Sequence, residues 1–344
     1  MRDQHPRVLF SCVAENRPAF ATMAHSLALS IRGFAGALAN AAIVVNFVDG
    51  VEPRFAAPLE ALGVQLRTVP RVSAANPLAN KLRMLELHAE HEFDVLVALD
   101  CDVIVVGDPS PWIDPGRIAA KAADFDRFDD DEWRRLFDVV RVPVPERTLT
   151  ATATGQRTYP YFNSGVVLVP HDVCGRLQTA WLATFADLGT ALAADPHLIR
   201  TRWQWLAEQA SLSLAVLRAE LPWTALPPEV NFPSHVPVPP GTLRGPPIVV
   251  HYHSERDVAG FLLRSRTPAI DPLIDRFNRR RAEVTGIPYS GLGRRSVPAR
   301  LKRDATDRLW GAVVDSPWYD SSAARRVRSA LKRAAPRGRR AAGL

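Results

Sequence analysis

The sequence predicts an α/β protein in which a central sheet carries helices on both faces. Strand and helix patterns alternate repeatedly through the first hundred residues, and the strand segment 95–99 is short, β-branched and without polar alternation. Buried parallel strands have this composition, and alternating strands and helices are typical of a parallel, doubly wound sheet. Ligands of such sheets bind outside the carboxyl ends of the strands. Polar residues that follow a strand are therefore the first candidates for a functional site.

The first half of the chain contains the clearest elements. The expected strands are apolar runs that end in polar, Pro or Gly residues, and they span 7–14, 42–51, 64–70 and 95–99. The expected helices have apolar residues at helical spacing and a Pro near the start, and they span 18–40, 53–62 and 77–91. Each strand is thus followed by polar residues at the same predicted edge of the sheet.

The second half is less regular. We expect a strand at 161–170, a long helix at 196–218 and a short buried strand within 246–254. Residues 222–247 contain 9 Pro, which is too many for regular sheet or helix. We therefore expect a long ordered loop there, around an acceptor groove.

Length and composition indicate a folded body with a basic end. The chain has 344 residues, of which 47% are hydrophobic and 23% charged, as in ordinary globular proteins. Its net charge of +7 belongs to the end, because residues 294–344 hold 14 Lys or Arg against 4 Asp or Glu. We therefore expect one domain at 1–290 and a basic extension at 291–344, helical or partly disordered.

Cysteines and apolar runs bear on the compartment. Cys12, Cys101 and Cys174 are far apart and lack the spacing of metal ligands, which argues against a disulfide framework or a zinc site. The start of the chain lacks the apolar core of a secretory signal, and no uncharged apolar run reaches membrane-spanning length. We expect a cytoplasmic protein whose membrane contacts, if any, are peripheral, on the inner membrane face.

Two acids interrupt the most apolar part of the sequence. Asp100 and Asp102 flank Cys101 between the strand 95–99 and the apolar run VIVV. In an extended chain, residues two apart point the same way, so the two acids share a face and Cys101 takes the other. Bare carboxylates there would repel each other and lose hydration, so a cation or another positive group is expected beside them. A hard divalent ion is the obvious candidate.

Other polar residues have weaker patterns. The acidic cluster from Asp124 to Glu132 matches no EF-hand loop and fits a solvated helix start better. Glu208 and Gln209 interrupt the helix 196–218 and are by default a surface pair. His251 and His253 end the last expected strand. A lone histidine at the end of a strand is usually structural, but two of them repeat the pattern of a strand that brings polar groups to the edge of the sheet. Gly165 permits a close backbone approach.

Six segments make the chain resemble nucleotide-sugar-dependent glycosyltransferases of the A-type fold, closest to family 8 and its bacterial relatives. These segments are ANKLRML, LDCDVIV with its Asp-x-Asp motif, YFNSGVVLV, EQASLSLAV, LPPEVNFP and VVHYHS, in the family's order. The resemblance spans residues 7–265 and implies a Rossmann-like mixed sheet with helices on both faces. It also implies transfer of a sugar from a nucleotide-diphosphate sugar, UDP-sugar favoured, to an unknown acceptor with retention of configuration. The segment HYHSERDVAG lacks the Lys-Pro-Trp that closes the family's last motif.

The resemblance implies roles for individual residues. Asp100 and Asp102 hold Mn²⁺ or Mg²⁺, which bridges the donor's diphosphate, and His251 is the third ligand, with His253 as the alternative. The residues implied near the nucleotide base are Ala14, Glu15, Asn16 and Arg17. Those implied near the rest of the donor are Lys81, Arg83, Cys101 and Ser164. The implied catalytic positions, near the sugar, the acceptor or the anomeric carbon, are Asn163, Glu208 and Gln209.

Two other functions remain open from the residues alone. A sugar-phosphate nucleotidyltransferase uses a related sheet but needs a Gly-rich phosphate loop, whereas this chain has CVAENRP after its first strand. A non-catalytic protein that binds membrane surfaces or polyanions is suggested by the basic extension, in which residues 325–334 have a basic amphipathic pattern. Nucleic acid is not an expected partner, because aromatic residues are few in that extension.

Overall fold

A computed structural model describes residues 6–73, 76–195, 203–253 and 255–294. The basic extension after residue 294 and the expected start of a helix at 196–202 lie outside these described residues. The domain division near residue 290 and membrane binding by the extension therefore stay predictions. Among the described residues, no helix is both long enough and apolar enough to cross a membrane.

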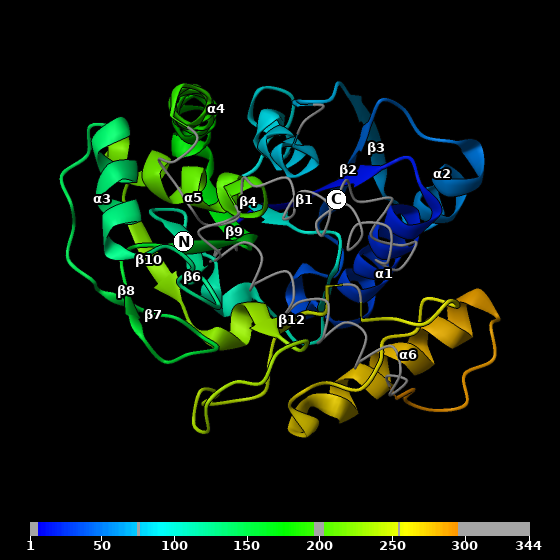
Figure 1. Ribbon diagram of the computed structural model, residues 1–344. Helices are drawn as coiled ribbons and strands as arrows, with labels where there is room; N and C mark the ends of the chain where they lie inside the picture. The colour runs from blue at the N-terminus through cyan, green and yellow to red at the C-terminus, as the bar shows by residue number, and fades with distance from the viewer. Residues whose placement is uncertain (1–5, 74–75, 196–202, 254, 295–344) are drawn as a thin grey trace, which may run out of the picture.

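A seven-stranded mixed sheet forms the centre of the molecule, in the order β10-β6-β9-β4-β1-β2-β3 (Figure 1). Strands β3, β2, β1 and β4 run parallel, whereas β9 runs antiparallel to both of its neighbours, β4 and β6. The mixed sheet implied by the resemblance is thus confirmed, and the all-parallel sheet predicted from alternation is wrong at β9. The strands span Val8–Glu15 (β1), Ala42–Val48 (β2), Gln65–Val69 (β3), Val95–Leu99 (β4), Ile118–Ala122 (β6), Phe162–Pro170 (β9) and Trp223–Leu226 (β10).

Helices cover both faces of this sheet, as expected. Alternate residues of β4 explain why: Val95, Val97 and Leu99 join the apolar cluster with α1 and α2, while Leu96 and Ala98 join the cluster with η2, α4 and α5. The segment expected as a helix at 77–91 is a helix of the 3₁₀ type. These helices span Pro18–Phe34 (α1), Pro53–Glu60 (α2), Pro77–Ala89 (η2), His171–Ala194 (α4) and Trp203–Arg218 (α5).

A small second sheet, in the order β11-β12-β5, lies beside the carboxyl end of β4. Its strands are Val103–Val105 (β5), Phe232–Pro233 (β11) and Val249–His251 (β12). β5 follows directly after the acidic pair and pairs antiparallel with β12, which places His251 opposite Val103. This pairing brings residues from two distant parts of the sequence to the same point.

The remaining elements surround these two sheets. The helix α6 lies along the side of the molecule that carries α1 (Figure 1). These elements are Gly36–Leu38 (η1), Ser110–Trp112 (η3), Asp130–Val139 (α3), Leu149–Thr150 (β7), Arg157–Thr158 (β8), Pro228–Asn231 (η4), Pro268–Ile270 (η5) and Asp271–Thr285 (α6).

Three expectations need correction. The Pro-rich segment 222–247 is not only a loop, because it contains β10, which tolerates flanking prolines as an edge strand paired with β6 alone. The sequence analysis did not identify α4, although its buried side chains recur at helical spacing. In the acidic cluster, Asp129 caps α3 with Glu132 in a capping box, as a helix start requires, but Asp124 is buried in the interior.

Candidate active site

The acidic pair lies where the two sheets meet, as the sequence analysis expected for a functional rim. Asp100 follows β4, and its backbone N–H donates to the carbonyl of Gly165 on β9 at 2.9 Å. The backbone N–H of Tyr252, just after β12, donates to the carbonyl of Asp102 at 3.1 Å. Both acids are therefore held by backbone hydrogen bonds on opposite sides, and His251 is placed beside them.

A buried lysine neutralises one of the two acids. The ammonium of Lys81, on η2, donates to Asp100 at 2.8 Å and to Glu208, on α5, at 3.0 Å. It also donates to the hydroxyl of Ser164 at 3.1 Å, and this hydroxyl lies 3.0 Å from the same oxygen of Glu208. Burial lowers the pKa of Lys81, but the two carboxylates outweigh it and raise that pKa above its ordinary value. Four of the expected site residues are thus brought together, and Lys81 is a positive partner for Asp100.

The imidazole of His251 faces both acids. Its Nε2 lies 3.3 Å from an oxygen of Asp102 and 3.8 Å from an oxygen of Asp100. Nε2 is buried and has no hydrogen-bond partner of good geometry among the described residues. The other ring nitrogen, Nδ1, lies 3.2 Å from the side-chain oxygen of Asn231. A ring nitrogen aimed between two carboxylates, with its opposite nitrogen occupied, is the arrangement of a metal-binding histidine.

The residues present therefore fit a divalent cation. Two carboxylates and one imidazole supply oxygen and nitrogen ligands, which suit Mn²⁺ and, through the oxygens, Mg²⁺. The ligand atoms of Asp102, His251 and His253 all lie within 4.8 Å of one another. Among the described residues, no other group of three potential ligands lies this close.

Charge at this point is concentrated on the acids and on His251. Burial raises the pKa of Asp102, but His251 outweighs that effect and holds this pKa below its usual range. For His251, burial lowers the pKa, whereas Asp102 and Asp100 raise it above the ordinary value. Burial and the neighbouring His251 lower the pKa of His253 to about 4, and burial lowers that of His235 to about 2. The two outer imidazoles are therefore uncharged at neutral pH.

The loop after β1 lies on the same rim, because β1 and β4 are parallel neighbours. Glu15 is nearly buried and accepts a hydrogen bond from Arg71 at 2.8 Å, and Arg17 lies 3.3 Å from its other oxygen. Asn16 accepts a hydrogen bond from the backbone N–H of Glu52 at 3.0 Å. The strand β1 ends at Glu15, one residue later than expected, and the loop that follows is therefore a fixed surface at the carboxyl end of the sheet.

Three expected residues are not joined to the acidic cluster by their side chains. Arg83 donates to the carbonyl of Pro70 at 3.0 Å and pairs with Glu86, so its guanidinium is engaged elsewhere. Cys101 packs into the apolar cluster of β12 and α6, as strand alternation predicted, and contributes only its backbone between the two acids. Gln209 follows Glu208 on α5 and is turned from it by about 100°, the rotation per helical residue.

The structure also adds residues that the sequence did not single out. Asn231 contacts His251 and lies in the segment LPPEVNFP, so the resemblance pointed to its neighbourhood but not to a role. The imidazole of His235 packs 3.8 Å, centroid to centroid, from that of His253. Asp124 binds Lys121 at 2.6 Å and Asn163 at 3.1 Å, which only the folded chain reveals.

Gly165 provides the space for the His251 ring. A Cβ atom added at this glycine would lie 2.7 Å from Cε1 and 2.8 Å from Nδ1 of His251, both far too close. We expect Gly165→Ala to displace the imidazole, to weaken Mn²⁺ binding at least about tenfold and to cost about 1–3 kcal/mol of stability. Calorimetric titration with Mn²⁺ and denaturant unfolding measure the two effects.

Gly189 offers a matched control for this substitution. It lies on α4, and a Cβ atom there meets nothing within 4 Å. Gly189→Ala should leave Mn²⁺ affinity unchanged and raise stability by up to about 1 kcal/mol, because Ala is the better helix former. Unaltered Mn²⁺ binding by the Gly165 variant would show that the ring is not held where the structure places it.

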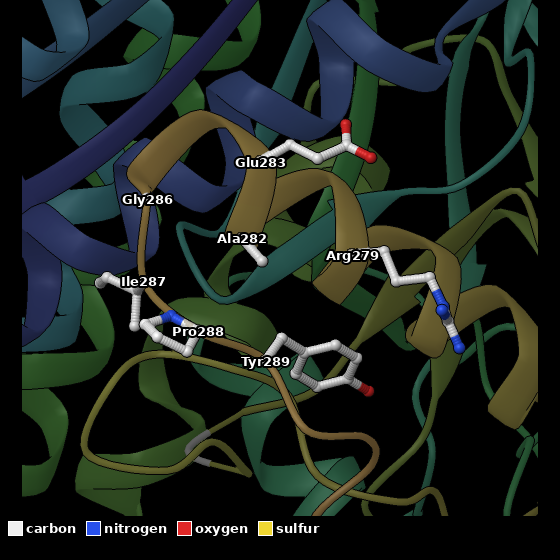
Figure 2. Close-up of a pocket in the computed structure, with 7 residues that line it drawn as sticks. All are labelled: Arg279, Ala282, Glu283, Gly286, Ile287, Pro288 and Tyr289. Atoms are coloured by element: carbon white, nitrogen blue, oxygen red, sulfur yellow. The ribbon is translucent and has the colours of Figure 1, made fainter.

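A surface hollow of about 380 Å³ lies at the end of α6 (Figure 2). Arg279 and Tyr289 line it, and both of these side chains are bonded to Asp275. None of the residues expected at the functional site lines this hollow.

The similarity of this chain to known proteins bears on its family. A search of curated proteins finds no match. Among solved structures, the chain is similar to mouse xyloside xylosyltransferase 1 in its apo form, with 14% identity, a TM-score of 0.44, and coverage of 71% of this chain and 97% of that one. The family model of the Rhodobacterales glycosyltransferase domain matches residues 10–220, which include the acidic pair, Lys81 and Glu208. Because this match covers more than half of the chain, the protein belongs to the Rhodobacterales glycosyltransferase family and is a glycosyltransferase.

Proposed function

We propose that this glycosyltransferase depends on a divalent cation, uses a nucleotide-diphosphate sugar, with a UDP-sugar favoured, and retains the configuration at the sugar's C1. One observation carries the proposal: the unpartnered Nε2 of His251 points between Asp100 and Asp102. When bound there, Mn²⁺ or Mg²⁺ supplies positive charge that stabilises the departing diphosphate. The nucleotide base is proposed to lie along the loop from Ala14 to Arg17, on the same rim.

His251 rather than His253 is the proposed nitrogen ligand. The rings of these two histidines are stacked, with centroids 4.3 Å apart and an angle of 6° between the ring planes. Because the lone pair of an imidazole lies in the plane of its ring, parallel stacked rings cannot both aim at one ion. Of the two, His251 lies within 3.8 Å of both acids. His253, with a left-handed φ of 51°, is proposed to hold the His251 ring from the side.

The chain's own residues support retention. Inversion needs a free carboxylate as a base that takes the acceptor's proton. The nearby carboxylates each face a cation or an imidazole. Asp100 and Glu208 bond Lys81, Asp124 bonds Lys121, and Asp102 lies 3.3 Å from Nε2 of His251. In the proposed reaction the C1–O bond of the donor breaks and leaves its electron pair on the diphosphate. The acceptor oxygen bonds to C1 from the same side, and its proton passes to the released phosphate oxygen.

A donor screen tests the proposed function. Thermal unfolding of the full chain would be followed with UDP-, GDP-, ADP-, CDP- and dTDP-sugars, each with Mn²⁺, with Mg²⁺ and with a chelator. We expect a UDP-sugar to raise the melting temperature only when a divalent cation is present. NMR of the released sugar or product would then show the anomer of the donor. The proposal fails if no nucleotide sugar stabilises the protein or if chelation leaves binding and turnover unchanged.

A further inference from the structure

A line of buried polar side chains runs from Lys121 to His251 behind the acidic pair. Each of these residues is at most 8% exposed. They come from β6, the turn after it, β9, η4 and β12, so only folding brings them together. The contacts are Lys121 Nζ to Asp124 Oδ1 at 2.6 Å, Asn163 Nδ2 to Asp124 Oδ2 at 3.1 Å, Asn231 Nδ2 to Asn163 Oδ1 at 3.0 Å and His251 Nδ1 to Asn231 Oδ1 at 3.2 Å.

The direction of every hydrogen bond in this line is fixed by chemistry. The backbone N–H of Gly165 can only donate, and it lies 2.8 Å from one end of the Asn163 amide, which must therefore be oxygen. The amide nitrogen of Asn163 then faces Asp124, which accepts a second hydrogen bond from Lys121. Asn231 must turn its own nitrogen to the Asn163 oxygen, because two oxygens cannot bond each other. Its remaining oxygen faces His251.

The end of the line therefore decides where His251 carries its proton. The oxygen of Asn231 accepts but cannot donate, so Nδ1 of His251 must be the protonated nitrogen. When the ring is neutral, the second nitrogen, Nε2, then has its lone pair in the direction of Asp100 and Asp102. Metal-bound histidines commonly donate their other N–H to an oxygen in this way, which fixes both the tautomer and the ring orientation.

We propose that Asn231 and Asn163 are positioning residues that hold His251 in the tautomer protonated on Nδ1, with the buried Lys121–Asp124 pair as the anchor of the line. The inference rests on the proposed function, because the lone pair of Nε2 serves a divalent cation. The inference also changes the role expected for Asn163, which was contact with the sugar or the acceptor. Three hydrogen bonds of its side chain lie within this network instead. Lys121 is held in turn by the hydroxyl of Thr152 and the carbonyl of Ala122, each at 2.9 Å.

Two substitutions of Asn231 separate a positioning role from a merely structural one. Asn231→Leu removes the acceptor for Nδ1, and we expect it to weaken Mn²⁺ binding by about 10–100-fold. Asn231→Asp keeps an oxygen toward Nδ1, so it should bind Mn²⁺ more tightly than the Leu variant. If Asn231 only supported the fold, the Asp variant would bind Mn²⁺ more weakly than the Leu variant, because a buried extra charge damages the fold more than an apolar side chain of similar size. Calorimetric titration of the full chain with Mn²⁺ gives the affinities.

The tautomer itself can be read directly. In the metal-free wild-type protein, at a pH where the His251 ring is neutral, long-range ¹H–¹⁵N correlation should place the proton on Nδ1. In Asn231→Leu the proton should be distributed over both nitrogens. Asn278→Leu is the matched control, because this buried amide of α6 bonds only to Leu262 and Tyr289 among the described residues. It should lower stability without changing Mn²⁺ affinity.

The outcomes are distinct. Wild-type affinity in Asn231→Leu, alongside lost binding in His251→Ala, would overturn the inference and leave the proposed function standing. A proton on Nε2 in the wild-type protein would also overturn it. If the wild-type protein binds neither Mn²⁺ nor Mg²⁺, the proposed function fails and the inference fails with it.

Discussion

Replacement of Asp102 by Asn is expected to abolish sugar transfer. Asp102 has the carboxylate nearest to Nε2 of His251, at 3.3 Å, and the substitution keeps its shape while removing its charge. Because Asp102 is a proposed ligand of the cation beside the departing diphosphate, loss of its charge should reduce kcat/KM by at least about 10³-fold. Steady-state kinetics with the donor identified in the screen measure this loss, and calorimetry should show the parallel loss of Mn²⁺ binding.

Asp94 provides the matched control at the other end of β4. It precedes β4, at the opposite end from the acidic pair, and accepts hydrogen bonds from the backbone and the side chain of Arg7. Asp94→Asn should leave kcat/KM within about twofold of wild type, since exposed ion pairs contribute little. If Asp102→Asn keeps more than a tenth of the wild-type kcat/KM, the acidic pair is not the centre of the reaction.

Replacement of Lys81 by Met is expected to have the largest effect on stability. Lys81 lies between Asp100 and Glu208, all three side chains being at most 15% exposed. Removal of the ammonium takes away the cation that both carboxylates bond and leaves Asp100 with the more distant His251, 3.8 Å away. The loss of one partner of a buried ion pair typically costs about 3–5 kcal/mol. Denaturant unfolding at neutral pH measures the loss. Addition of Glu208→Gln to the Lys81 variant should recover part of it, because it removes one of the uncompensated charges.

An exposed ion pair serves as the comparison for Lys81. Arg54 lies 2.7 Å from Glu52, and both side chains are well exposed. Arg54→Met should therefore cost less than about 1 kcal/mol. A cost for Lys81→Met as small as this would mean that Asp100 and Glu208 are hydrated or protonated without the lysine, against the buried cluster described here.

Local patterns in the sequence were sufficient for much of the fold. Apolar β-branched runs located β1, β2, β4 and β9 correctly, because a buried strand needs side chains of this kind on both faces. The expected strand β3 is also present, but it lies at the edge of the sheet and only its last residue, Val69, is buried. The antiparallel direction of β9 could not be derived from composition, since strand direction depends on the path of the chain between β6 and β9. The edge strand β10 was missed because prolines flank it, and these are tolerated only at an edge.

The same division holds for the candidate site. The Asp-x-Asp pattern identified Asp100 and Asp102, because charge inside an apolar run has an electrostatic cost that is visible without a structure. The prediction that a positive group accompanies them is met first by Lys81, which bonds Asp100. Two oxygens lie toward His251, one from Asp102 and the Asp100 oxygen that already accepts from Lys81. Their use by a metal ion stays a prediction.

The sequence by itself determined an α/β fold, a rim of polar residues after its strands and a pair of acids that needs positive charge. Only the tertiary structure decided which groups supply that charge and how His251 is oriented. The reason is that tautomer and charge pairing depend on contacts between residues far apart in the chain, such as Asn231 with Asn163 and Lys81 with Glu208. Such contacts leave no periodic trace in the sequence, whereas burial of a strand or a helix face does.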